Sequence, residues 1–107
     1  MLFRSIREYV DRHARSPFRE WLDGVDQTAR ARIQARLLRV ELGNLGDHKS
    51  VGGGVHELRL DFGPGFRLYF GRDGQTIVLL LIGGTKATQA RDIRRARDYW
   101  REYLEDE

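Results

Sequence analysis

The sequence contains no cysteine, and this absence narrows the chemistry that the protein can use. Disulfide frameworks, thiolate zinc sites and cysteine nucleophiles are all excluded, so any reactive group must carry oxygen or nitrogen. Long hydrophobic runs are also missing. The longest apolar stretch, residues 77–82, is far shorter than the roughly 20 residues that a membrane-spanning helix needs. We therefore expect a cytoplasmic protein with no membrane partner.

Lysine is scarce as well. Of the 19 basic residues only Lys49 and Lys86 are lysines, which leaves 17 arginines. Arginine carries a planar fork of donors that binds two phosphate oxygens at once, so this bias favours phosphate recognition. A GC-rich genome, whose codons favour arginine, would produce the same excess. The placement of the arginines has to decide between these two explanations.

Proline is rare, and the chain shows no repeat, no low-complexity tract and no linker rich in proline, glycine or serine. A length of 107 residues lies in the usual range for one domain. Aromatic and aliphatic residues are numerous enough to build one core. We therefore expect residues 1–107 to form a single domain whose site shares residues with that core.

Local signals in the first half predict a strand and then two helices. Residues 3–10 carry β-branched and aromatic side chains with poor alternation, which favours an edge strand. Ser16 followed by proline is typical of a helix start, and Gly24 is expected to end that helix. Apolar residues at helical spacing after the cap candidate Asp26 predict a second helix that ends at Gly43. The two helices are expected to form an αα-hairpin.

The second half switches from helical spacing to alternation. Residues 44–54 are rich in glycine and are expected to form a flexible connection, followed by a hairpin of strands over 57–62 and 66–70. Residues 75–82 are apolar on both faces and predict an interior strand, and 85–104 predict a terminal helix. The expected fold class is α+β: an antiparallel sheet of about four strands with the αα-hairpin and the terminal helix packed on it. Its element order is strand, helix, helix, strand, strand, strand, helix.

Charged and aromatic side chains of the central hairpin are expected to share one face of the sheet. If the Gly-Pro-Gly loop has three residues, Asp61 lies opposite Arg67 and Arg59 lies opposite Tyr69, while leucines and phenylalanines fill the other face. Lys86, after the last strand, is expected near Arg67. Such a cluster favours binding of a phosphodiester and of the charge that develops on it. The alternative is a set of ordinary cross-strand ion pairs, which contribute little at exposed sites.

The next turn predicts what lies beside this cluster. The Asp-Gly pair at 73–74 is a strong hairpin signal. A turn centred on it would bring Val78 and Leu80 alongside Tyr69 and Arg67. These two aliphatic residues would then give the polar cluster an apolar floor.

Histidine is the usual base for making a 2′-hydroxyl attack a neighbouring phosphate. His48 lies in the glycine-rich connection beside Lys49 and could swing over the sheet face to play that role. The alternative is an exposed loop histidine. His56 shares the strand parity of Leu58 and is expected to pack at a margin of the sheet.

Carboxylates are too few here for a metal-dependent nuclease. Glu57 and Asp61 alternate with arginines and make a poor magnesium site. The glycine run 52–54 lacks the Lys-Ser/Thr ending of a phosphate-binding P-loop, which disfavours nucleotide hydrolysis. We therefore expect neither a metal nor a cofactor.

The second predicted helix carries a row of three arginines. Arg32, Arg36 and Arg39 lie one turn apart beside its apolar stripe and could bind RNA, as could Lys49. The alternative is a solvated helix flank, which is routine on amphipathic helices. Removing the row without touching the sheet would distinguish the two.

Six short segments, in this order, resemble the phage-derived addiction module killer proteins, a HigB-like branch of the RelE/ParE toxin superfamily. The resemblance runs along nearly the whole chain, and the combination is more specific than any one piece. The segments are SPF at 16–18, WLDG at 21–24, GNLGD at 43–47, ELR at 57–59, GPGFRLYF at 63–70 and LLIGGTK at 80–86.

The resemblance implies a RelE-like compact domain with the fold of microbial ribonucleases. It also implies metal-independent cleavage of messenger RNA, commonly on the ribosome, and a cognate helix-turn-helix antitoxin as partner. The sheet arginines of the family correspond to Arg59 and Arg67, and its basic residue after the last strand corresponds to Lys86. This sequence lacks the lysine pair and the late tyrosine of the best-known ribosome-dependent members.

The resulting hypothesis is a toxin of a type II toxin–antitoxin system that acts as an endoribonuclease. Arg59, Arg67 and Lys86 would hold the phosphate charge, and Tyr69 or His48 would move protons. Two alternatives stay open: a non-enzymatic ParE-like poison of DNA gyrase, and a plain RNA- or DNA-binding regulator.

Overall fold

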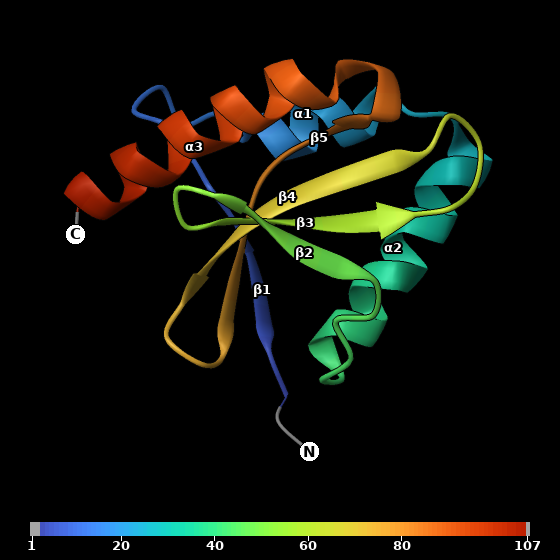
Figure 1. Cartoon of the computed structure of the whole chain (residues 1–107), viewed down its shortest axis with the longest axis horizontal. Helices are drawn as coiled ribbons and strands as arrows, with labels where there is room; N and C mark the ends of the chain where they lie inside the picture. Colours follow the sequence, from blue (N-terminus) through green and yellow to red (C-terminus); the bar gives the residue numbers. More distant parts are fainter. Residues whose placement is uncertain (1–2, 107) are drawn as a thin grey trace.

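A computed structural model describes residues 3–106 of the chain, so three residues of the expected domain, 1, 2 and 107, lie outside the described part (Figure 1). The model contains five strands, three α-helices and one short 3-10 helix. These elements are β1 (Ser5–Glu8), α1 (Pro17–Asp23), α2 (Gln27–Glu41), β2 (His48–Gly52), β3 (Val55–Leu60), β4 (Phe66–Asp73), β5 (Ile77–Thr85), η1 (Lys86–Thr88) and α3 (Gln89–Glu105). The expected α+β class is confirmed.

The strands form one mixed sheet in the order β1-β5-β4-β3-β2. The expectation of about four antiparallel strands was wrong in two respects, since there are five strands and β1 pairs with β5 in parallel. After β1 the chain passes through α1 and α2 and enters the sheet again at the opposite edge, as β2. The strands β3, β4 and β5 then follow in order, so the last of them, β5, pairs with β1. The predictions that β1 lies at an edge and β5 in the interior are confirmed.

The glycine-rich connection is more ordered than expected. It contains β2, which pairs antiparallel with β3 from His48 opposite Leu58 to Gly52 opposite Val55. The three glycines at 52–54 all have positive φ angles, which suits a tight turn better than a loose linker. A Cβ atom on Gly54 would lie 2.5 Å from Nε1 of Trp100 on α3, so this turn also needs glycine for space. The glycines serve a hairpin that composition alone does not distinguish from a flexible segment.

Both predicted helix starts are confirmed by their caps. The Ser16 side chain accepts a hydrogen bond from the Arg19 amide at 3.0 Å, and α1 ends at Gly24. The Asp26 carboxylate accepts from the Ala29 amide at 3.2 Å at the start of α2. Each cap satisfies an amide that has no partner within its own helix.

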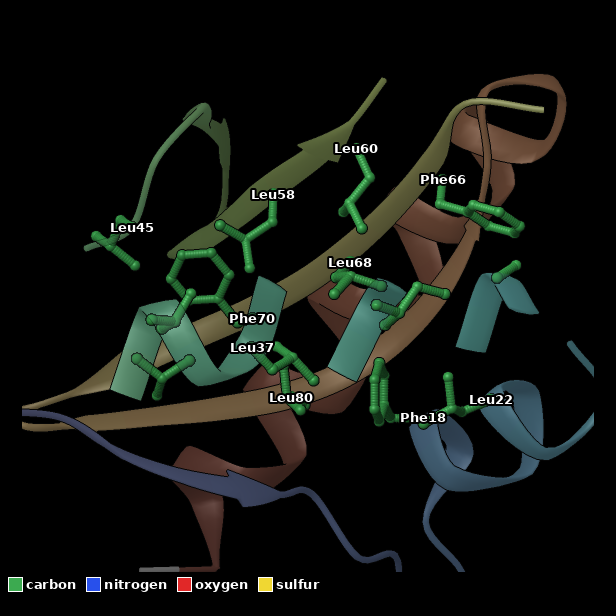
Figure 2. Close-up of a cluster of buried hydrophobic side chains, with 14 residues drawn as sticks. Phe18, Leu22, Leu37, Leu45, Leu58, Leu60, Phe66, Leu68, Phe70 and Leu80 are labelled. Carbon is green, nitrogen blue, oxygen red and sulfur yellow. The ribbon is translucent and has the colours of Figure 1, made fainter. Parts of the chain in front are cut away.

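The sheet buries a separate apolar cluster on each face. One cluster joins α1 and α2 to one face, and Figure 2 shows its sheet members packed against Phe18, Leu22 and Leu37. These sheet members include Leu58, Leu60, Phe66, Leu68, Phe70 and Leu80. The second cluster joins α3 to the other face through Tyr69, Leu79, Leu81, Ala96 and Trp100. We call the two sides the α2 face and the α3 face.

Candidate phosphate-binding site

The polar side chains of the central hairpin do lie together on the α3 face, as their parity predicts. Their pairing differs from the prediction, because Arg59 lies opposite Arg67 and Glu57 lies opposite Tyr69. The loop between Leu60 and Phe66 has five residues instead of three, which moves the register by two positions. A shift of two keeps every side chain that remains in the strands on its predicted face, while a shift of one would have reversed it. Asp61, which was expected opposite Arg67, instead lies in the loop and is exposed.

The next pairing was also wrong in detail. Arg67 lies opposite Gly84 and Tyr69 opposite Ile82, whereas Leu80 pairs with Phe70. Asp73 pairs with Ile77, so the turn holds three residues, 74–76, instead of the Asp-Gly pair alone, and β5 is displaced from the expected register by an odd number of positions. Val78 and Leu80 therefore join the cluster of the α2 face and do not form the floor of the polar site. Beyond Leu80, an irregularity between Tyr69 and Phe70 inserts one extra residue into β5.

Glu57 is the centre of the polar cluster. Its carboxylate is fully buried and lies 3.1 Å from Nε of Arg59 and 3.9 Å from Nε of Arg67. Gln89, the first residue of α3, donates from Nε2 to the same carboxylate at 2.7 Å. Burial by itself would raise the pKa of Glu57, but the hydrogen bonds from Gln89 and Arg59 outweigh it and hold the pKa below its ordinary value. Glu57 is therefore a fixed negative charge between two guanidinium groups.

The two arginines differ in access. Arg67 is 7% exposed, and its Nη1 donates to the Phe66 carbonyl at 3.0 Å. Its Nε atom is buried and has no hydrogen-bond partner among residues 3–106. The Arg59 side chain is 34% exposed and forms the edge of the cluster that solvent reaches. An incoming anion would therefore meet Arg59, with the positive charge of the buried Arg67 behind it.

Tyr69 does not fit the expected role of an accessible proton carrier. The residue is fully buried in the α3-face core, and its hydroxyl makes no hydrogen bond of normal geometry. Burial, and next to it the charge of Glu57, raise the pKa of the phenol. The shift disfavours the phenolate, and the burial removes the hydroxyl from solvent. Tyr69 is therefore a core residue that packs beside the cluster.

Two lysines flank the arginines on the same face. The Lys86 amide donates to the Gly65 carbonyl at 2.8 Å, which places Lys86 beside the hairpin loop and near Arg67, as expected. Lys49 lies directly opposite Glu57 in the β2–β3 pairing, and directly opposed residues point to the same face of a sheet. Both lysines are exposed. Lys49, treated at first as a residue of a loop, is thus placed at the cluster by a strand.

The structure separates His48 from this cluster. His48 lies opposite Leu58, whose side chain belongs to the α2-face core, so the imidazole is on the other side of the sheet. Its Nδ1 lies 2.9 Å from the Gly46 carbonyl. The expectation that His48 reaches the polar face is therefore wrong. His56 packs as predicted: its ring stacks on Phe70, and burial lowers its pKa.

The three helical arginines do not form one uniform row. Arg36 is buried and holds the following loop by donating to the carbonyls of Leu45 at 2.6 Å and Asp47 at 3.2 Å. Arg32 and Arg39 are exposed. Arg36 is therefore a structural residue, and only its two neighbours are free to meet a ligand.

Comparison with known proteins places the chain beside one bacterial relative. A Haemophilus influenzae protein, described as an uncharacterized protein, is 44% identical over 81 residues, which cover 75% of this chain and 82% of that protein. The two belong to one family. No family model matches the chain.

Sequence reasoning missed the central role of Glu57 and the contribution of Gln89. The sequence alone marks Glu57 only as a poor magnesium ligand that alternates with arginines. The sequence does contain the relevant pattern, because Glu57, Arg59, Arg67 and Tyr69 share one strand parity. A single carboxylate on the same face as two arginines is expected to pair with both. Gln89 joins them only through the packing of α3, which strand parity does not show.

Metal-binding groups and membrane-spanning helices are both absent from the part of the chain that the structure describes. Residues 3–106 contain no group of three or more acidic, histidine or cysteine side chains placed to hold a metal ion. No helix in that range is long and apolar enough to cross a bilayer. What the cluster offers chemically is a set of fixed cations around one buried carboxylate.

Proposed function

We propose that this protein is the toxin of a type II toxin–antitoxin pair and that it cleaves messenger RNA without a metal. The proposal rests on the resemblance to the HigB-like killer proteins and on the arginine cluster of the α3 face. A helix-turn-helix antitoxin would be its partner, and the ribosome would present the RNA. The RelE-like identity of the fold is part of the same proposal.

The charge balance of the cluster is the observation that carries the proposal. Arg59 and Arg67 supply two positive charges, and Glu57 neutralises one of them. The remaining charge matches the single negative charge of a phosphodiester. The exposed edge of Arg59 offers donors to its oxygens, and the buried Arg67 adds its positive charge behind them. Lys49 and Lys86 would hold the additional charge that builds during cleavage.

The proposed reaction is attack of an RNA 2′-hydroxyl on its own 3′-phosphate. The new bond joins the 2′-oxygen to phosphorus, and the bond from phosphorus to the 5′-oxygen of the next nucleotide breaks, which leaves a cyclic phosphate. One proton leaves the attacking hydroxyl and one is delivered to the departing oxygen. Tyr69 is buried and His48 lies on the other face, so Lys49, which is exposed on the α3 face, is the side chain that remains to move these protons.

Replacement of Arg59 tests the proposal. The variant Arg59→Gln removes the accessible cation and keeps an N–H donor where Nε of Arg59 donates to Glu57. RNA cleavage and growth arrest should therefore both be lost while the fold persists. New RNA ends mapped in a translation reaction measure the first, and induction in growing cells measures the second. The matched control is Arg94→Gln, which removes an exposed arginine from α3. Full cleavage by Arg59→Gln would show that the site is misplaced.

Arg67 is a poorer target for this test. A charge-reversing Arg67→Glu change would bury a second carboxylate beside Glu57, so loss of activity could reflect unfolding alone. Arg59 is only partly buried, so its replacement should remove the site without unfolding the protein. Circular dichroism on both variants separates loss of the fold from loss of the site.

A non-enzymatic poison of DNA gyrase is the second candidate. It is favoured by the burial of Tyr69 and by the position of His48 on the other face, which leave few accessible proton carriers. A supercoiling assay run beside the RNA-end mapping distinguishes the two candidates. Loss of supercoiling without new RNA ends would favour the poison. A plain nucleic-acid-binding regulator would give neither effect.

A further inference from the structure

A second feature rich in arginine lies where β3 extends beyond β2. Beyond Leu58 no residue of β2 pairs with β3, and the side of α2 meets the end of β3 across a groove of about 370 Å³. Its lining consists of Arg32, Ala35, Arg36, Arg39, Arg59, Leu60, Asp61 and Phe62. Four arginines and one aspartate leave this lining with an excess of three positive charges.

One arginine of the groove lies over an aromatic ring. The guanidinium carbon of Arg32 lies 3.8 Å from the centroid of the Phe62 ring, which is a cation–π contact. Phe62 is itself half-buried and packs against Phe66, so it forms a fixed support. Arg32 is nevertheless exposed, so its guanidinium stays accessible to a ligand in the groove.

Arg59 belongs to both features. Its Nε binds Glu57 in the cluster of the α3 face, while the residue also lines the groove beside α2. A strand bound in the groove would consequently reach the proposed cleavage site at Arg59 without crossing another element. The two features form one continuous cationic path around the end of β3.

We infer that the groove binds the nucleotides of single-stranded RNA next to the cleaved phosphate. Arg39 and Arg59 would contact backbone phosphates, and a base would stack on the plane of Arg32. Single strands fit this arrangement because their unstacked bases expose a face to a guanidinium, whereas a duplex keeps its base faces covered. The inference rests on the proposed function, since it gives the substrate of the same site its path.

Asp61 provides a second test, because its negative charge should oppose the binding of an anion in the groove. Its carboxylate lies in the lining of a groove that is proposed to hold an anion. Removing that charge with Asp61→Asn should strengthen RNA binding, while removing Arg32 and Arg39 should weaken it. A surface that influences binding only through overall fold stability would not respond in opposite directions.

The experiment measures binding separately from cleavage. A fluorescent single-stranded oligonucleotide with 2′-O-methyl groups at every position cannot be cut by 2′-hydroxyl attack, so the intact wild-type protein can be titrated at several salt concentrations. We expect the double variant Arg32→Gln/Arg39→Gln to raise Kd and to reduce the slope of log Kd against log salt by about 0.7, since Arg39 is the one phosphate contact it loses and each such contact contributes about 0.7. Arg94→Gln is the control for removal of one positive charge elsewhere.

Each outcome decides the inference. Weaker binding by the double variant, tighter binding by Asp61→Asn and weaker binding of the same oligonucleotide as a duplex support it. A double variant that binds like Arg94→Gln, or equal loss for the duplex, overturns it. Cleavage of ordinary RNA is scored independently, so a protein that binds through the groove and never cuts would refute the nuclease proposal and leave the groove in place.

Discussion

The two faces of the sheet differ in what they bury. On the α2 face the buried strand residues of the cluster are leucines, phenylalanines and one valine, with Ile6 partly buried beside them, and two helices close over them. On the α3 face the strands also bury Glu57 and Arg67, and the covering helix buries Asp92. Apolar side chains can be covered by any helix with an apolar stripe, whereas buried charges are tolerated only beside matched partners. The α3 face therefore tolerates less change in its residues, as expected of a face that carries a site.

Asp92 illustrates how closely the α3 face is matched. Thr88 donates to its carboxylate at 2.5 Å, and Nε of Arg91 lies 3.4 Å from the other oxygen. A Cβ atom on Gly84 of β5 would lie 1.8 Å from the Asp92 carboxylate, so the strand needs glycine there to admit it. No comparable buried carboxylate lies in the described cluster of the α2 face.

The largest effect that this contrast predicts is at Glu57. The change Glu57→Gln leaves the buried Arg67 without its counter-charge and should lower the free energy of unfolding by about 3–5 kcal/mol. Urea unfolding measures the loss. Asp61→Asn, which removes an exposed carboxylate from the same hairpin, should change stability by less than about 0.5 kcal/mol. Equal effects at the two positions would remove the distinction between the faces.

The lowered pKa of Glu57 predicts that the stability of the protein depends on pH. The pKa of Glu57 is lowered from 4.5 in the folded protein, so the folded state favours the charged carboxylate. This contribution is fully present above pH 4.5 and is lost as the pH falls through the lowered value. The stability difference between the wild-type protein and Glu57→Gln should therefore shrink in acid. A difference that stays constant from pH 7 to below 4.5 would contradict the fixed charge.

Truncation on the α2 face should cost stability without this pH dependence. Leu58→Ala removes a fully buried side chain and should lower the free energy of unfolding by about 2–5 kcal/mol, because a cavity remains. The loss should be the same at neutral and acidic pH, measured by the same urea titrations. A pH-dependent loss at Leu58 would mean that the two faces are coupled more closely than their packing indicates.

The smallest of these effects is expected at Arg36, the buried charge on the α2 side. Arg36→Met keeps an unbranched apolar stem and removes the donors to the Leu45 and Asp47 carbonyls, which should cost about 1–3 kcal/mol. Hydrogen exchange at residues 44–47 should rise more than elsewhere, since this loop loses its anchor. If the exchange rises uniformly, Arg36 supports the whole fold and not this loop.

Local chemistry made much of the fold predictable. Ser16 and Asp26 cap their helices where expected, and the alternation from Glu57 to Phe70 assigned each side chain to its correct face. Those features depend on neighbours within a few residues, so the sequence carries them directly. The position of Arg59, Arg67 and Tyr69 on one face of the sheet is also a local feature of this kind.

Tertiary structure decided the pairing of the strands, the closure of the site and the reach of each side chain. The five-residue loop after Leu60 and the three-residue turn after Asp73 set the register of the two hairpins, and no periodicity in the sequence reveals either length. Packing of α3 then buried Tyr69 and brought Gln89 to Glu57, while the β2 pairing sent His48 to one face and Lys49 to the other. Parity is determined by the geometry of one strand, but burial and register depend on contacts between residues far apart in the chain.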